Sequence, residues 1–151
     1  MSESSQPSIA APSNAIITTW SAPLRFDAVY GTGHSRVDCE GHDAPAPLDA
    51  VLQALSACAA SDVVLILQKQ RAVVTALRVG ATAHRVTTTP RRFASIALHF
   101  EIEGRNLDRA KAERAIDLSL TRHCSVRESL NPEITVQWTV EVQSLGSAES
   151  Q

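Results

Sequence analysis

The sequence has no marked excess of charge of either sign. Its 151 residues include 14 basic and 16 acidic side chains, giving a formal net charge of −2. Proteins that neutralise nucleic-acid phosphates or anionic lipid headgroups carry a basic stripe or patch, and this sequence has none. The charge balance therefore argues against nucleic acid or a membrane surface as the partner.

Several motifs with well-defined chemistry are also missing. The five histidines show no His-x-x-x-His spacing and the three cysteines form no Cys-x-x-Cys, so zinc and iron are not indicated. There is no Gly-x-Ser-x-Gly nucleophile elbow, and no glycine-rich phosphate loop precedes a helix. We therefore expect neither a metal nor a cofactor.

Features of a targeting or membrane-spanning segment are lacking as well. The first residues have neither a basic segment nor an apolar run, and no stretch of about 18 uninterrupted apolar residues follows. Three cysteines at irregular spacing make a poor disulfide framework, which is typical of a reducing compartment. We expect a cytoplasmic protein in which any disulfide is transient.

What the sequence does contain is enough apolar material for one core. Residues 1–14 and 143–151 are small and polar and are expected to be disordered tails around a single domain, 15–142. Hydrophobic periodicity predicts strands at 15–20, 25–30, 34–39, 77–84, 96–103 and 134–142. Helices are expected at 50–67, after an N-cap at Asn106, and from a capping box at Ser125. The predicted fold class is α+β, with antiparallel strands around a long buried central helix.

The helix expected at 50–67 is apolar on nearly every face. Pro47 and Asp49 suit its first turn, because a proline there loses no hydrogen bond and a carboxylate faces the positive end of the helix dipole. A helix this apolar must be buried almost all round, either at the centre of one chain or between two. We expect a homodimer with a shared core.

Two cysteines stand where chemistry is possible. Cys58 lies within the apolar helix, and Asp62 follows four residues later on the same face. Burial and this carboxylate both favour the neutral thiol, so Cys58 needs a cation, for which we select Arg25, oriented by Asp49 or Asp62. Cys124 precedes a helix start and has basic neighbours, which favours its thiolate.

Packing is the alternative role for each of these cysteines. Free cysteine is among the most buried residue types, so Cys58 and Cys124 could both be small core fillers. Cys39 at the end of a predicted strand has no partner motif and is assigned to packing.

The segments around Cys58 and Cys124 together resemble known protein motifs. Residues 45–64 resemble the central helix of the OsmC/Ohr family, and residues 123–126 resemble its second cysteine motif. Trp20, the Gly33-His34 pair and the strand order add to a resemblance that covers about residues 15–142.

This resemblance implies an α+β fold in which two chains intertwine, with two active sites at the subunit interface. Similar family members reduce organic or inorganic hydroperoxides. In them the cysteine that matches Cys58 attacks the peroxide and becomes a sulfenic acid, and the one that matches Cys124 closes a disulfide. A dithiol of the lipoyl or thioredoxin type then reduces the disulfide.

One position departs from the family pattern. Family members carry a glutamate ten residues before the first cysteine, where this chain has Leu48, followed by Asp49. One residue turns a side chain by about 100° around a helix, so Asp49 does not point in the direction of that glutamate. In this respect the chain is more similar to a less characterised branch of the family. The predicted function is a thiol-dependent reductase of organic hydroperoxides. The alternatives are a redox-responsive thiol switch and a dimeric protein that binds a small ligand without turnover.

Overall fold

The computed structural model describes residues 8 and 14–146. The chain divides into two compact units, Met1–Ala50 and Val51–Gln151. Most of the two expected tails lies outside the described residues, but the last strand continues to Leu145, beyond the expected domain end at 142. A single domain over 15–142 stays a prediction.

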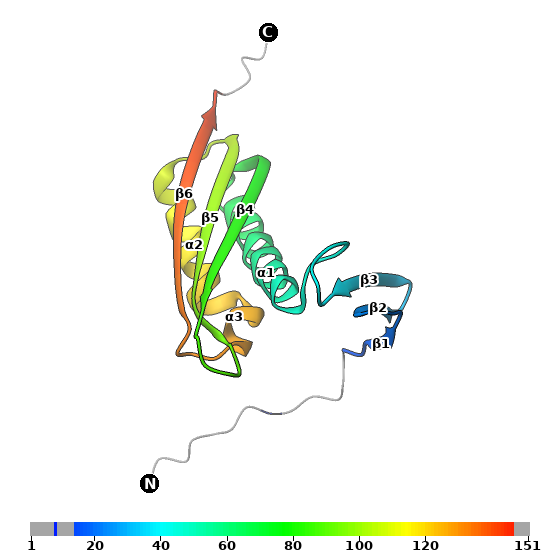
Figure 1. Cartoon of the computed structure of the whole chain (residues 1–151). Coiled ribbons are helices and arrows are strands. Elements are labelled where there is room, and N and C mark those ends of the chain that lie inside the picture. Colours follow the sequence, from blue (N-terminus) through cyan, green and yellow to red (C-terminus); the bar gives the residue numbers. More distant parts are fainter. Residues whose placement is uncertain (1–7, 9–13, 147–151) are drawn as a thin grey trace. The chain divides into compact units, whose positions relative to one another are not determined.

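The first unit contains a three-stranded antiparallel sheet. Its strands follow in chain order as β1 (Ile17–Trp20), β2 (Arg25–Tyr30) and β3 (Gly33–Asp38), as Figure 1 shows. Gly31 turns the chain between β2 and β3 with a φ of +51°, which glycine adopts without steric cost. The opening meander predicted from the sequence is confirmed.

Helix α1 (Pro47–Lys69) begins at the predicted proline. Within one chain its buried residues form a single stripe at four-residue spacing: Leu55, Ala59, Val63 and Leu67. Leu65, on another face, is 57% exposed. Burial on almost all sides is therefore not achieved by one chain, and the shared dimer core stays a prediction. By length and composition α1 could also cross a membrane, a test that core helices of soluble proteins pass too.

The second unit contains a sheet of three long strands in the order β4 (Val73–Arg85), β5 (Phe93–Arg105) and β6 (Thr135–Leu145). β4 and β5 are antiparallel, whereas β5 and β6 are parallel. The expectation of antiparallel strands throughout was therefore wrong for β6. The helices between β5 and β6 form the long crossover that a parallel pair requires, so the chain re-enters the sheet in the direction of β5.

The core of this unit lies on one side of the sheet, where Figure 1 shows α1 and α2 (Arg109–Leu118) together. Alternate residues of β5 are buried: Ile96, Leu98, Phe100 and Ile102. Successive side chains of a strand point to opposite sides of a sheet, so these four residues share one side. The predicted alternation of β5 is confirmed.

The start of α2 differs from its prediction. Asp108 is the N-cap, and its carboxylate accepts a hydrogen bond of 2.8 Å from the backbone N–H of Lys111. Asn106 was wrongly chosen, because it has a φ of +51° and its side chain donates to the carbonyl of Arg71. It therefore closes a loop contact two residues before the helix cap.

Candidate active site

Three reactive side chains meet in the second unit. The Sγ atoms of Cys58 and Cys124 and a carboxylate oxygen of Asp62 all lie within 4.8 Å of one another. Cys58 and Asp62 are half-buried on adjacent turns of α1, and Cys124 is only 4% exposed. The structure thus brings together three of the five predicted site residues. A Cys58–Cys124 disulfide stays a prediction.

An irregular helical turn carries the chain from α2 to Cys124. The π-helix η1 (Ser119–His123) continues α2, and the backbone N–H of Cys124 donates to the carbonyl of Ser119 over 2.8 Å. A π turn adds a residue to each hydrogen-bonded ring, so it changes the direction in which following side chains point. Such turns are frequent at functional sites, and this one precedes the buried cysteine.

Ser119 connects this turn to α1. It is fully buried, and its Oγ lies 3.1 Å from Oδ2 of Asp62 and 3.3 Å from the carbonyl oxygen of Ala59. Sequence reasoning missed this residue. The available signal was its place in the buried row of α2, where Ala112, Ala115 and Ile116 are followed by a polar side chain. Ser119 holds the Asp62 carboxylate beside the two thiols.

Cys124 caps the short helix α3 (Ser125–Ser129), with its Sγ accepting from the backbone N–H of Arg127 at 3.4 Å. The helix start at Ser125 was predicted correctly, but Cys124 and not Ser125 is its cap, and the expected effect of the helix start on the thiol was wrong. Burial raises the pKa of Cys124 to about 11, and it outweighs the Arg127 N–H, which lowers it. The Cys58 thiol raises it further. Cys124 is therefore a neutral thiol near pH 7.

The basic neighbours of Cys124 do not offset its burial. Arg122 and His123 are exposed, and the Arg127 guanidinium donates to the carbonyl of Ile134 over 3.0 Å. A cavity of about 290 Å³ adjoins Cys124 and is lined by residues 121–125 with Glu128 and Ser129. Cys124 therefore contributes to the wall of a cavity although it is only 4% exposed.

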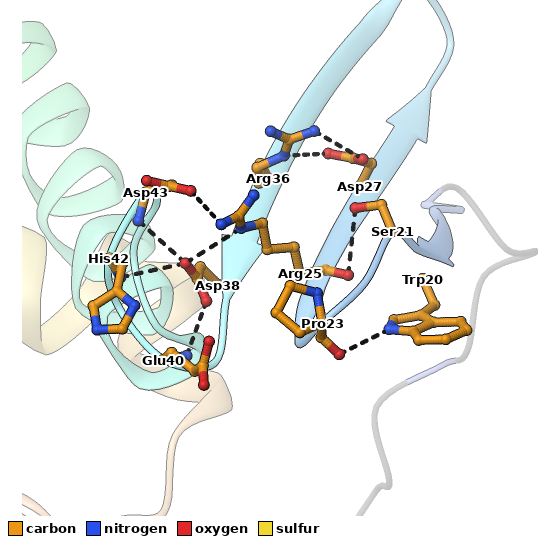
Figure 2. A network of polar contacts seen from close by, with 10 residues as sticks. All are labelled: Trp20, Ser21, Pro23, Arg25, Asp27, Arg36, Asp38, Glu40, His42 and Asp43. Carbon is orange, nitrogen blue, oxygen red and sulfur yellow. Dashed lines mark hydrogen bonds and ion pairs between the residues drawn. The ribbon is translucent and has the colours of Figure 1, made fainter.

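Arg25 lies in the first unit, in a network of acidic groups (Figure 2). Its Nη2 is 2.6 Å from Oδ2 of Asp43, and its Nε is 3.7 Å from Oδ2 of Asp38. That Nε is buried without a hydrogen-bond partner among the described residues. The sequence identified the arginine but not the two aspartates that hold it.

Asp38 organises this network. It is 1% exposed, and its carboxylate accepts the backbone N–H groups of Glu40, His42 and Asp43 at 2.9, 3.3 and 3.1 Å. These hydrogen bonds, led by that from Glu40, hold the pKa of Asp38 below its usual range, and the charge of Arg25 adds to the effect. The guanidinium of Arg25 is therefore anchored by an ionised, buried carboxylate.

The remaining predicted residues have less defined roles. Asp49 lies exposed in the first turn of α1 and, like Arg25, belongs to the first unit. That Arg25 stabilises the Cys58 thiolate and that Asp49 orients Arg25 stay predictions. Cys39 is exposed, so its assignment to core packing was wrong. It follows the end of β3, where the chain has left the sheet.

Two groups of donor atoms have metal-like spacing among the described residues: Cys58, Asp62 and Cys124, and His99, Glu101 and Glu141. Each offers three donors, one fewer than a structural zinc site and as many as the protein supplies in a catalytic one. The second group lies on the sheet, with His99 Nε2 and Glu141 Oε1 3.7 Å apart and both side chains partly exposed. We assign no metal to either group.

Comparison with known proteins agrees with the fold and extends over both cysteines. The family model described as OsmC-like protein matches residues 40–139. Protein YhfA of Escherichia coli K12 is 38% identical over 125 residues, which are 82% of this chain and 93% of that protein.

Solved structures share the same fold. An OsmC-like protein from Mycoplasma pneumoniae has a TM-score of 0.77 at 19% identity, covering 89% of this chain and 99% of that one. An organic hydroperoxide resistance protein OsmC from Legionella pneumophila has a TM-score of 0.67 at 17% identity, covering 87% and 100%. The predicted α+β, OsmC-like fold is confirmed. On the family match and the identity to YhfA, this chain belongs to the family of OsmC-like proteins.

Proposed function

We propose that this protein is a thiol-dependent reductase of organic hydroperoxides. The observation that carries the proposal is the approach of the Cys58 and Cys124 sulfurs to within 4.8 Å, which is the arrangement that a peroxide-reducing thiol pair requires. Structural relatives named as organic hydroperoxide resistance proteins support the choice of substrate class.

The proposed reaction has two steps in the protein. The Cys58 thiolate attacks the outer peroxide oxygen; a sulfur–oxygen bond forms, the oxygen–oxygen bond breaks, and the alkoxide takes a proton and leaves as an alcohol. Cys124 then attacks the Cys58 sulfenic acid; a disulfide forms and water leaves. An external dithiol reduces the disulfide and so supplies the two electrons of each cycle.

The environments of the two cysteines support this division of roles. The thiolate is the nucleophile in such chemistry, and burial keeps Cys124 protonated at neutral pH. Cys58 is half-buried and therefore more open to a peroxide than Cys124, which is buried. We assign the first attack to Cys58 and the resolving step to Cys124.

The proposal includes a cation and a second subunit. Arg25 is the group we assign to stabilise the Cys58 thiolate, with Asp49 to orient it. The apolar composition of α1, together with the 57% exposure of Leu65, favours a homodimer. A cytoplasmic location, in which lipoyl-type or thioredoxin-type dithiols are available, fits the cycle.

Peroxide consumption by the pure protein tests the proposal. With a dithiol present, cumene hydroperoxide should be consumed over many turnovers and faster than hydrogen peroxide. Cys58→Ser should abolish turnover, because a hydroxyl keeps the packing but loses the nucleophile. Cys39→Ser is the matched control and should keep full activity, since Cys39 is exposed and outside the cluster.

Two outcomes would replace the proposal. Oxidation by one equivalent without turnover would favour a redox-responsive switch. Thiols that stay slow toward every peroxide, together with an apolar ligand retained through purification, would favour a binding protein.

A further inference from the structure

The thiol pair does not by itself account for Asp62. Reducing a peroxide and closing a disulfide require two sulfurs, yet a half-buried carboxylate lies within 4.8 Å of both. A negative charge beside a thiol disfavours the thiolate, so Asp62 does not assist the first attack through its charge. Its position calls for a role in the second step.

We propose that Asp62 accepts the proton of the Cys124 thiol as this sulfur attacks the Cys58 sulfenic acid. The sulfur–sulfur bond forms, the sulfur–oxygen bond of Cys58 breaks, and Asp62 returns the proton to the departing hydroxide, which leaves as water. No external oxidant, reductant or metal enters this step. The inference rests on the proposed function, because the sulfenic acid is its substrate.

The surroundings of Asp62 suit a proton acceptor. Its position four residues after Cys58 puts both side chains on one face of α1, and Ser119 holds Oδ2 from the other side over 3.1 Å. Ser119 is fully buried and cannot swing away into solvent. Distances to reacting atoms are often long before the reacting state forms, so separations below 4.8 Å are compatible with proton transfer.

Cys124 needs such an acceptor. Its pKa of about 11 leaves little thiolate at neutral pH, and a neutral thiol is a poor nucleophile unless its proton is removed during the attack. The titratable and charged groups around it come from α1, from α3 and from the cavity: Cys58, Asp62, Arg122, His123, Arg127 and Glu128. Of these, His123 is the rival base, and it is exposed.

The central test uses Asp62→Asn, in which an amide of the same shape can still accept from Ser119. Reduced protein receives one equivalent of cumene hydroperoxide at pH 7; a dimedone-type probe traps sulfenic acid, and mass spectrometry follows the disulfide. We expect Cys58 oxidation to be at least as fast as in the wild type. Disulfide formation should be slower by about 100-fold, and Cys58 sulfinate should accumulate.

The pH profile separates proton transfer from a merely structural effect. In the wild type, the disulfide step should change little between pH 6 and pH 8. In Asp62→Asn its rate should rise about tenfold per pH unit, because the thiolate fraction does so below the pKa. Asp62→Glu keeps a carboxylate and should recover at least about tenfold of the lost rate. Asp117→Asn, an exposed change on α2, is the matched control and should behave as the wild type.

A second reaction keeps the inference distinct from the proposed function. An aromatic disulfide can load Cys58 with 5-thio-2-nitrobenzoate, whose release reports the attack of Cys124 without any peroxide. Failure of Cys58 to react with peroxide would contradict the reductase, whereas loss of the Asp62 dependence in this release would contradict the proton acceptor. Wild-type rates and pH slopes in Asp62→Asn, or a slow step caused by His123→Gln instead, would overturn the inference.

Discussion

The Cys124 thiol is subject to two effects of opposite sign. The start of α3 offers the backbone N–H of Arg127, which favours the thiolate, while burial favours the neutral thiol and is the larger effect. The sequence indicated the helix start and the basic neighbours of Cys124, but it did not indicate that Cys124 is buried. Cys124 therefore lies at the N-cap of α3, but its burial determines the protonation state of the thiol.

Alkylation against pH tests this balance. Because burial raises the pKa of Cys124 to about 11, its iodoacetamide reaction should keep accelerating through pH 10 without levelling off. Cys39, exposed on the same chain, is an internal reference when both sites are read by peptide mass spectrometry. A Cys124 rate that levels off near pH 7 would show that the helix start prevails over burial.

Asp38 gives a second pH dependence, from a pKa that is lowered where that of Cys124 is raised. Its folded-state pKa lies below the ordinary value of 3.8, so its stabilisation is complete above that pH and is lost as pH falls through the lower folded value. Asp38→Asn should lower the unfolding midpoint at pH 7. It should also make the midpoint decrease less steeply than in the wild type as the pH is lowered. Glu40→Gln is the control, since Glu40 contributes its backbone N–H and not its side chain. Parallel acid curves for wild type and Asp38→Asn would contradict this role.

Among the elements, β5 is the centre of the second unit because it pairs with β4 on one side and β6 on the other. Its register with β4 shifts between Val74 and Ala76, and Gly104 lies opposite Val74 at this irregularity. A Cβ on Gly104 would run into the backbone carbonyl of Val73. The close approach of the two backbones therefore requires glycine.

Gly104→Ala and Gly80→Ala form a matched pair that tests this approach. Gly80 in β4 has open space where a Cβ would stand, so its change should be neutral or slightly stabilising in urea unfolding. Gly104→Ala should cost about 1–3 kcal/mol, because backbone atoms cannot move aside as a side chain can. Equal stability of the two variants would show that β4 shifts freely at the irregularity.

Local patterns predicted the existence and type of nearly every element, because strand alternation and the apolar run of α1 depend only on residues that are close together in the sequence. The parallel direction of β6 was missed, since alternation is the same in either direction and only the crossover decides it. The site divides in the same way. Cys58, Asp62 and Cys124 could be selected from their positions and a family resemblance. The place of Ser119 in the buried row of α2 could have marked it as a buried polar residue, but not its contact with Asp62, which joins residues far apart in the chain.

At the scale of the whole molecule, the open question is what covers α1. Its buried stripe occupies one face, and Leu65 on another is 57% exposed in a helix with few charged residues. Leu65 is exposed apolar surface of the kind that a subunit interface buries. A second copy of the chain is the occupant that the homodimer prediction supplies.

Sedimentation of Leu65→Lys tests the dimer. The wild type should sediment as a dimer at micromolar concentration, and a charge at Leu65 should shift it toward monomer because burying an unpaired ammonium is costly. Gln68→Lys, an exposed polar position on the last turns of α1, is the control for added charge. A monomeric wild type would contradict the shared core.

If Cys58 and Cys124 act as one redox pair, one equivalent of organic hydroperoxide oxidises them together, and peptide mapping of the product shows whether it does. We expect a disulfide between these two cysteines within a single chain, with Cys39 still free to be alkylated. A linkage to Cys39, or a Cys58 sulfinate as first product while Cys124 remains alkylatable, would contradict it.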